Sequence, residues 1–377
     1  MTIANGAEPT VRIGSTAILV GAAAAVVVVA GLRAASGIVG PTVLALSLTI
    51  VFHPLRLRLE RRLPSWAASV IVLVGVYALV LGLVLALVIS LGRFAVMVPQ
   101  YDTELDQHVA DVGNWLTARG VGEEQAATMV QAVDPGRLVG FATSIMSGVL
   151  SAVSSIFFLL TLLLFMSFDG AEATQLAAGA RRQRPQLVSA LGSFAQGTRT
   201  YLGVSAVFGL IVAVIDTLAL WALGVPGALI WGVLAFITNF IPNIGFVIGV
   251  IPPALVGLLE GGPGLMIVVI VLYCLINFVI QSVIQPRYVG NAVGLSTTLT
   301  FLSLVFWTWV IGPLGAILAV PLSLFFKAVL VEADPLQAWL NRVLSGRAET
   351  WGEVNEEIAK APKHVSTTTR VPTEHGL

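Results

Sequence analysis

Four polar side chains recur at every fourth position near the end of a long apolar segment of this chain. They are Tyr273, Asn277, Gln281 and Gln285, and most of their neighbours are aliphatic or aromatic. Residues four apart share one face of an α-helix, so these side chains form a polar stripe. Amides in an apolar setting either hydrogen-bond to neighbouring helices or line a path for a polar solute. We interpret the three amides as solute contacts, because the stripe leads directly to a Pro-Arg pair; bonding between helices stays open as the alternative.

A single carboxylate, Asp216, lies deep in the apolar segment 201–224, which contains no basic residue. A charged side chain at the centre of a bilayer costs about 2.5–3.5 kcal/mol on insertion scales, and such residues usually mark an ion or proton path. We therefore predict that Asp216 couples transport to a proton or a monovalent cation. The alternative is a hydrated position near the outer interface, because Gly224 and Pro226 follow only two turns later.

Two apolar segments, 226–258 and 298–330, must position these side chains, and proline and glycine interrupt each near its middle. A continuous helix of about 33 residues would be about 50 Å long, whereas the hydrocarbon core of a bilayer is about 30 Å thick. Backbone that leaves the helix in lipid is tolerated only where protein or a water-filled cavity satisfies its polar groups. We predict that both segments are re-entrant hairpins of two half-helices, with kinked spanning helices as the alternative.

The interruptions supply further candidate residues. Asn239 and Asn243 stand beside the first break, where exposed half-helix ends attract charged and polar groups, so we expect them to contact the solute. The residues expected to shape the backbone are Pro242, Gly245, Pro313 and Gly315. Each break follows one full helix, and the two halves face opposite ways. This is a weak inverted repeat of the kind found in transporters.

The composition sets the class of the protein. Hydrophobic residues make up 57% of the 377 residues and charged residues 11%, and the mean hydropathy is +0.93. Soluble domains carry about 25% charged residues, so we predict an all-α polytopic membrane protein with about eight membrane segments. A formal net charge of +0 offers no basic face for nucleic acid. The histidines are scattered and no phosphate-binding loop or nucleophile elbow occurs, so we expect no enzyme, no metal and no cofactor.

Hydropathy and the distribution of arginine predict the order and orientation of the segments. Arginine-rich loops face the cytoplasm, and arginines cluster after the second and fourth spans, so we expect both termini to be cytoplasmic. The predicted units are a cytoplasmic N-terminus (1–14), three transmembrane helices (15–92), an extracytoplasmic helical insert (93–142), a fourth transmembrane helix (143–167), a cytoplasmic amphipathic loop (168–200), a transport core (201–330) and a cytoplasmic tail (331–377), disordered at its end.

Three ordered blocks resemble the autoinducer-2 exporter (AI-2E) family of bacterial permeases. The blocks are 236–253, beginning Phe-Ile-Thr-Asn-Phe-Ile-Pro-Asn-Ile-Gly, 281–296, beginning Gln-Ser-Val-Ile-Gln-Pro-Arg, and 312–321, Gly-Pro-Leu-Gly-Ala-Ile-Leu-Ala-Val-Pro. The resemblance covers roughly residues 15–340 and implies oligomeric permeases of the bacterial cytoplasmic membrane. It also implies export of autoinducer-2 or sodium(lithium)/proton antiport. Family membership does not select between these, and the chain departs from the family pattern at Asn243 and near Ser296.

Residues and resemblance together predict a permease that exports a small polar organic solute by alternating access around the two breaks, with proton coupling through Asp216. The expected partners are the lipid bilayer, the solute or a monovalent cation or proton, and further copies of the chain in a homo-oligomer. Two other functions stay open. One is Na+(Li+)/H+ antiport, which should require Asp216, and the other is a non-transporting membrane scaffold, in which the polar stripe only joins helices.

Overall fold

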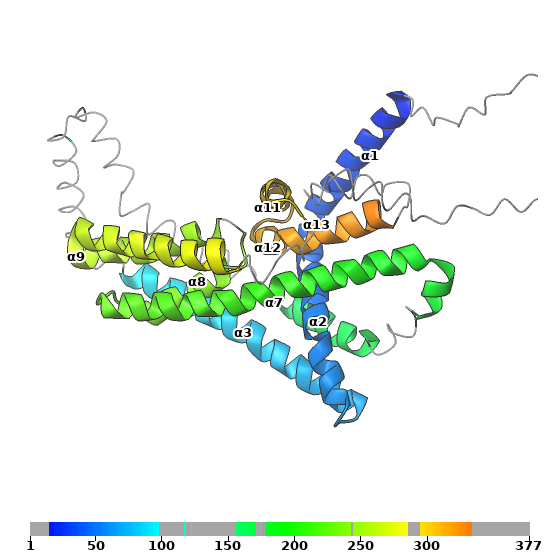
Figure 1. Cartoon of the computed structure of the whole chain (residues 1–377), viewed down its shortest axis with the longest axis horizontal. Helices are drawn as coiled ribbons and strands as arrows, with labels where there is room; N and C mark the ends of the chain where they lie inside the picture. Colours follow the sequence, from blue (N-terminus) through cyan, green and yellow to red (C-terminus); the bar gives the residue numbers. More distant parts are fainter. Residues whose placement is uncertain are drawn as a thin grey trace, which may run out of the picture.

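The structure, a computed structural model, describes residues 15–97, 117, 122, 156–170, 176, 178–242, 244–285 and 295–333. Within these residues the regular elements are helices, and no strand occurs (Figure 1). This confirms the predicted all-α class. The predicted N-terminal unit, most of the predicted insert, Asn243 and the predicted tail beyond residue 333 lie outside the described residues.

The helices divide into two groups along the chain. The first group holds α1 (Ser15–Ala34), α2 (Ser36–Glu60), α3 (Ser65–Met97) and a helix over Ile156–Gly170. The second group holds α7 (Pro185–Ala222), α8 (Ala228–Thr238), α9 (Gly245–Asn277), α11 (Thr297–Ile311), α12 (Pro313–Ile317) and α13 (Ala319–Lys327). Two π-helical segments, η2 (Phe278–Ile284) and η3 (Ala328–Glu332), continue α9 and α13.

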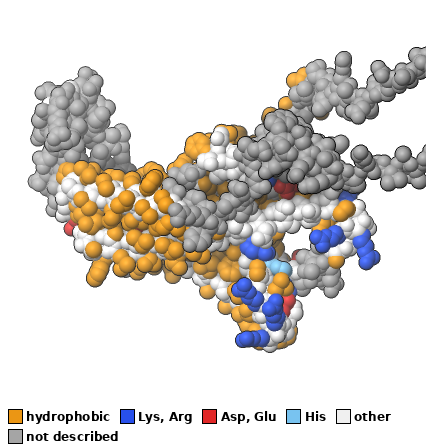
Figure 2. All heavy atoms as spheres, viewed as in Figure 1, with side chains coloured by type: hydrophobic (Ala, Val, Ile, Leu, Met, Phe, Trp, Pro, Cys, Tyr) orange, Lys and Arg blue, Asp and Glu red, His pale blue; other side chains and the backbone are white. Residues whose placement is uncertain are grey.

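Length and composition mark several of these helices as candidate membrane spans. Four of the described stretches are long and apolar enough to cross a bilayer, namely α2, Ser65–Ile89 of α3, α7 and Gly245–Gln281, and shorter apolar helices accompany them. Hydrophobic side chains cover the end of the molecule formed by α3, α8, α9 and the C-terminal half of α7 (Figure 2), and Leu218 and Trp221 of α7 and Leu275 of α9 are exposed. A continuous apolar surface of this kind belongs against lipid. The protein is therefore a polytopic membrane protein.

Helix α7 is a long element that runs across the molecule in Figure 1. It begins at Pro185, and proline suits the first position of a helix because the N–H it lacks would have no helical partner there. The hydropathy pattern predicts an amphipathic segment ending at residue 200 and a separate span starting at Tyr201, whereas the structure joins residues 185–222 in one helix of 38 residues. At 1.5 Å per residue α7 is about 57 Å long. It therefore extends well beyond a hydrocarbon core of about 30 Å.

Helix α8 and the first half of α9 form a helical hairpin, here named the first hairpin. Helix α8 ends at Thr238, and the chain turns through Pro242 before α9 begins at Gly245. A Cβ added at Gly245 would overlap the carbonyl oxygen of Thr238, and one added at Gly249 would lie 3.8 Å from the Cα of Ala235. Position 245 thus faces 238 and position 249 faces 235. The two helices therefore run antiparallel.

Helix α9 itself reverses direction at Gly261 and Gly262, where Gly262 has a φ of 68°. Residues nine apart would be about 13.5 Å apart along a straight helix. A Cβ added at Gly257, however, would lie only 3.5 Å from the Cα of Met266. The apolar stretch Gly245–Gln281 is therefore two packed helices and not one long span, although its length and composition alone would allow one. The second of these helices continues into η2 and carries the polar stripe.

The second predicted interruption is also a break between helices, and α11, α12 and α13 form what is here named the second hairpin. Gly312, with a φ of 82°, ends α11, and Pro313 begins α12. A Cβ added at Gly315 would overlap the carbonyl oxygen of Trp307, which repeats the close approach at Gly245. The Trp307 indole donates a hydrogen bond of 3.0 Å to Oγ of Ser323 and so joins α11 to α13.

Candidate functional site

A small cavity lies beside the first hairpin, between α7, α8 and α9 with η2. Its volume is about 10 Å³, which is close to the space that one water molecule requires. The lining residues are Val212, Asp216, Ala235, Thr238, Asn239, Phe246, Gly249, Tyr273, Asn277 and Gln281. Four of the six predicted contact residues are among them, and they come from three separate segments of the chain.

Three amide side chains on the cavity wall bond to one another. Nε2 of Gln281 donates to Oδ1 of Asn277 at 2.8 Å and to Oδ1 of Asn239 at 3.2 Å. Nδ2 of Asn277 donates in turn to the carbonyl oxygen of Tyr273 at 2.9 Å. Tyr273 and Asn277 are 1% and 5% exposed. This part of the polar stripe therefore faces protein, and it reaches the first hairpin through Asn239.

The backbone of the first break is held by α7. A helix end leaves carbonyl groups without helical partners, and the Tyr201 hydroxyl donates to the carbonyl oxygen of Phe240 at 3.0 Å. Nδ2 of Asn239 donates to the carbonyl oxygen of Ser205 at 2.9 Å. Gly209, one turn further along α7, leaves room for this amide, because a Cβ there would lie 2.9 Å from Nδ2. Protein groups thus pair with the backbone of the break, as a lipid environment requires.

Asp216 is fully buried, with 0% of its surface exposed. Neither carboxylate oxygen has a hydrogen-bond partner among the described residues, and the same holds for the Tyr273 hydroxyl. Nearly all buried polar atoms in folded proteins are hydrogen-bonded. No Lys or Arg is among the lining residues. The three oxygens therefore suit a ligand that supplies a proton or positive charge.

The remaining predicted residues do not line the cavity. Gln285 follows η2, one turn beyond Gln281, and is absent from the wall. Asn243 lies outside the described residues. The four backbone residues shape the breaks themselves, Pro242 and Gly245 the first and Pro313 and Gly315 the second.

The apolar part of the wall was not predicted, and it consists of Val212, Ala235, Phe246 and Gly249. A signal existed for two of these residues. Val212 precedes Asp216 by four positions and Ala235 precedes Asn239 by four, and residues four apart share a helix face. Phe246 and Gly249 offer no comparable signal, since only the antiparallel packing of the first hairpin brings them to the cavity.

The polar stripe passes from α9 into the π-helical segment η2, which contains Gln281. Such segments are rare and occur frequently at functional sites. Among the residues that the structure describes, no group of three or more His, Cys, Asp or Glu side chains could hold a metal ion. The wall instead offers amide donors and acceptors, hydroxyls and one carboxylate. This arrangement suits reversible binding of a polar solute or a monovalent cation.

Comparison with known protein families matches residues 22–333 to the family described as AI-2E family transporter. A protein of Escherichia coli (strain K12) named "Putative transport protein YhhT" is 33% identical over 307 residues, which cover 81% of this chain and 88% of the relative. The "AI-2 transport protein TqsA" of the same organism is 31% identical over 331 residues, which cover 86% of this chain and 95% of the relative. Because the family match spans most of the chain, this protein belongs to the AI-2E transporter family.

Proposed function

We propose that this protein exports a small polar organic solute across the bacterial cytoplasmic membrane by alternating access. The observation that carries the proposal is the cavity beside the first hairpin. There a network of three amides lies beside a fully buried carboxylate that has no hydrogen-bond partner among the described residues. Fixed polar groups in an otherwise apolar wall orient a polar ligand. Membership of a transporter family supports the same function.

The size of the cavity indicates which step the conformation represents. Small-molecule sites usually occupy about 300–1,000 Å³, whereas this cavity of about 10 Å³ would be filled by one water molecule. We infer a closed conformation, from which the solute enters when the first hairpin moves away from α7. The bonds that must then open are Tyr201 to Phe240 and Asn239 to Ser205.

The proposal treats both hairpins as re-entrant. Helix α8 has 11 residues and α11 has 15, so they are about 16 and 22 Å long, shorter than a hydrocarbon core of about 30 Å. Basic side chains gather away from the apolar end, over the α2–α3 turn and the start of α7 (Figure 2). The positive-inside rule assigns this side to the cytoplasm. Cytoplasmic termini and a homo-oligomer stay predictions.

Autoinducer-2 is the first solute to test, because one relative is named an AI-2 transport protein. Proteoliposomes containing the full chain should accumulate or release it, or another labelled polar solute, faster than empty liposomes. Gln281→Leu should reduce this flux at least tenfold, because the amide network loses its central donor. The variant should still fold and unfold in one cooperative thermal transition. Gln186→Leu, the same change at an exposed position at the start of α7, should leave the flux unchanged. Normal flux in Gln281→Leu would show that the amide network does not contact the solute.

A second candidate function is Na+(Li+)/H+ antiport, which the unpartnered oxygens of Asp216 and Tyr273 favour. Hard oxygen ligands suit small cations. Under antiport, adding sodium or lithium to proteoliposomes should change the internal pH, and Asp216→Asn should abolish that change. Solute flux without a cation-driven pH change would reject antiport. A protein that moves neither cations nor polar solutes would instead be a membrane scaffold.

A further inference from the structure

Two buried side chains with unpaired oxygens come from different helices to the wall of the cavity beside the first hairpin. They are Asp216 of α7 and Tyr273 of α9. Neither the carboxylate oxygens of Asp216 nor the hydroxyl of Tyr273 has a hydrogen-bond partner among the described residues. The carboxylate nevertheless acts electrostatically on the hydroxyl. The two groups are therefore neighbours that form no direct hydrogen bond.

Apolar packing fixes the ring of Tyr273. It belongs to a buried cluster that includes Leu220, Trp231 and Val250, and the backbone carbonyl of Tyr273 accepts a hydrogen bond from Asn277. Protein interiors are close-packed, so the ring cannot swing its hydroxyl toward a different partner. The hydroxyl of Tyr273 therefore stays at the wall of the cavity.

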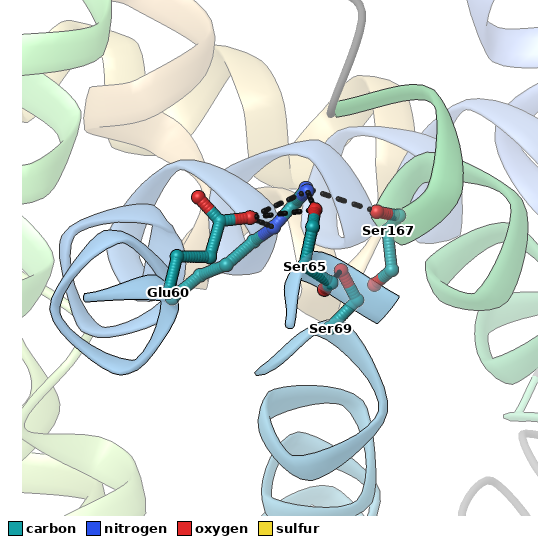
Figure 3. A network of polar contacts seen from close by, with 5 residues as sticks. Glu60, Ser65, Ser69 and Ser167 are labelled. Atoms are coloured by element: carbon teal, nitrogen blue, oxygen red, sulfur yellow. Dashed lines mark hydrogen bonds and ion pairs between the residues drawn. The ribbon is translucent and has the colours of Figure 1, made fainter. Parts of the chain in front are cut away.

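Arg56 shows how this protein pairs a buried charge. Arg56 and Asp216 are the buried residues of charged type in the described part of the chain. The guanidinium of Arg56 forms a 3.0 Å ion pair with Glu60 and donates to the carbonyl oxygen of Ser167 at 3.1 Å (Figure 3). Burying a charge is costly unless it is paired and hydrogen-bonded. Asp216 has neither kind of partner among the described residues, so a neutral carboxyl group fits this position and a carboxylate does not.

The charged and titratable side chains of the helices around the cavity lie away from this pair. Among the described elements, α8 and η2 contain none. Besides Tyr273, α9 carries Cys274, which is exposed, and Glu260, which stands at the turn of this helix. On α7 the nearest charged residue before Asp216 is Arg199, about 25 Å away along the helix.

The other elements that pack against α7 contact its first half. Helix α13 and η3 pack against Phe194, and Arg199 bonds the carbonyl oxygen of Ile50 of α2. The charged and titratable side chains of these elements are His53, Arg56, Arg58 and Glu60 of α2 and Lys327 and Glu332 of α13 and η3. The Tyr201 hydroxyl of α7 itself bonds the Phe240 carbonyl oxygen. No positive charge of the described residues therefore balances a carboxylate in the cavity.

We propose that this cavity is a proton site, in which one water molecule joins a neutral Asp216 carboxyl group to the Tyr273 hydroxyl and keeps the first hairpin closed against α7. The inference rests on the proposed function of the same cavity and adds what controls its opening. The volume of about 10 Å³ suits one water molecule, and a buried water makes about three hydrogen bonds.

The wall supplies these bonds. Asp216 and Tyr273 each donate a hydroxyl hydrogen to the water, and the water donates to the amide oxygens of Asn239 and Asn277. Each amide oxygen accepts one bond from Gln281 and has a second lone pair. Tyr273 is thus a positioning residue that holds the water against the carboxyl group.

Loss of the proton opens the cavity. The O–H bond of the carboxyl group breaks, the proton passes to an entering water molecule, and the carboxylate that remains requires hydration. Water reaches it when the first hairpin leaves α7, which breaks the neutral bonds from Tyr201 to Phe240 and from Asn239 to Ser205. Neutral hydrogen bonds contribute less than the hydration of a buried carboxylate. The deprotonated protein therefore opens to a polar solute, and proton and solute occupy the cavity in turn.

Infrared difference spectroscopy of the purified full-length chain in lipid tests for the neutral carboxyl group. Exposed carboxyl groups are ionised at about pH 7, so we expect a protonated-carboxyl band at this pH that Asp216→Asn removes. Tyr273→Phe should keep the band and shift its frequency, because the water loses one of its two donors. Tyr77→Phe, the same change at a hydroxyl that bonds the Leu160 carbonyl oxygen outside this cavity, is the matched control and should leave the band unchanged.

Hydrogen exchange of the α8 amides measures the closure. Raising the pH should speed exchange in the wild type beyond the intrinsic effect of pH, because the first hairpin opens when Asp216 loses its proton. Asp216→Asn stays neutral at every pH, so it should remove this excess and slow exchange about tenfold in alkaline solution. Neither measurement requires the solute. A protein with both effects and no flux would keep the proton site and contradict the transport function.

Several results would overturn the proposal. A wild type without the band, or a band that persists in Asp216→Asn, would mean that Asp216 is not neutral in the closed cavity. Loss of the band on adding sodium or lithium chloride at constant pH would assign the cavity to a monovalent cation. An unchanged frequency in Tyr273→Phe, or an equal shift in Tyr77→Phe, would remove the positioning role of Tyr273. Equal exchange in Asp216→Asn and the wild type at every pH would show that the proton does not control the first hairpin.

Discussion

The two hairpins of this protein share a backbone arrangement and differ in the chemistry around it. In each, a proline stands at the break, and a glycine two or three residues later lies against a carbonyl oxygen of the preceding helix. Gly245 lies against the carbonyl oxygen of Thr238, and Gly315 lies against that of Trp307. The first hairpin contributes Asn239 to a network of amides beside a buried carboxylate. The second hairpin is packed among buried residues that are almost all apolar.

This difference separates two tasks that a broken helix can perform. A break determines where two half-helices can part, because it removes hydrogen bonds that would make the helix continuous. Polar side chains determine where a solute is held. We expect the second hairpin to act as a support, because most of its contacts with α1 and α2 are apolar and its Trp307 indole is already bonded to Ser323. The polar exception is the Arg33 guanidinium of α1, which lies over the Trp309 ring at 4.5 Å.

The largest expected effect tests the shared backbone. Gly245→Ala and Gly315→Ala should each lower the free energy of unfolding by about 3 kcal/mol or more, because the added Cβ overlaps a backbone oxygen that cannot move without its helix. Thermal unfolding in detergent would measure both. In the control Gly264→Ala the new Cβ meets nothing within 4 Å, so we expect a change below about 1 kcal/mol. A stable Gly315→Ala protein beside an unfolded Gly245→Ala protein would contradict a common backbone arrangement.

The next effect separates stability from function in the first hairpin. Asp216→Leu should raise the free energy of unfolding by about 1–3 kcal/mol, because it removes a buried carboxylate that no residue in the described part of the chain bonds, and it should abolish transport. Thermal unfolding and flux into proteoliposomes would be measured on the same preparation. Ser303→Ala, a buried polar position in α11, is the counterpart in the second hairpin and should leave flux unchanged. If Asp216→Leu lowers the free energy of unfolding and leaves the flux normal, the carboxylate stabilises the fold and takes no part in transport.

Local rules explain which parts of this protein could be predicted from its sequence. Proline and glycine act on the backbone where they stand, so both breaks were predicted at Pro242 and Pro313. The spacing of Asn277 and Gln281 reflects the period of the helix, so their shared face was predicted as well. Asp216 was predicted as a functional residue because its segment is apolar and contains no basic side chain that could balance the charge of the carboxylate.

Contacts between distant positions could not be predicted in this way. Arg56 belongs to the arginine cluster after the second predicted span, which was expected to form a cytoplasmic loop, whereas α2 continues to Glu60. The carbonyl oxygen that Arg56 bonds, that of Ser167, lies 111 residues away. Arg199 resembled the end of a cytoplasmic segment, but the structure holds it in the middle of α7 through its bond to Ile50. Hydropathy records how apolar each segment is and contains no information about such pairings.

The smallest expected effect compares one hydrogen bond in each hairpin. Tyr201→Phe removes the donor to the Phe240 carbonyl, and Trp307→Phe removes the donor to Ser323 Oγ, so each should lower the free energy of unfolding by about 1 kcal/mol. Only Tyr201→Phe should change the rate of solute flux, because its bond must open when the first hairpin leaves α7, whereas the second hairpin stays in place. Flux measured at matched protein content would distinguish them. An equal change of flux in both variants would mean that the two hairpins move together, and the division between a moving and a supporting hairpin would then be wrong.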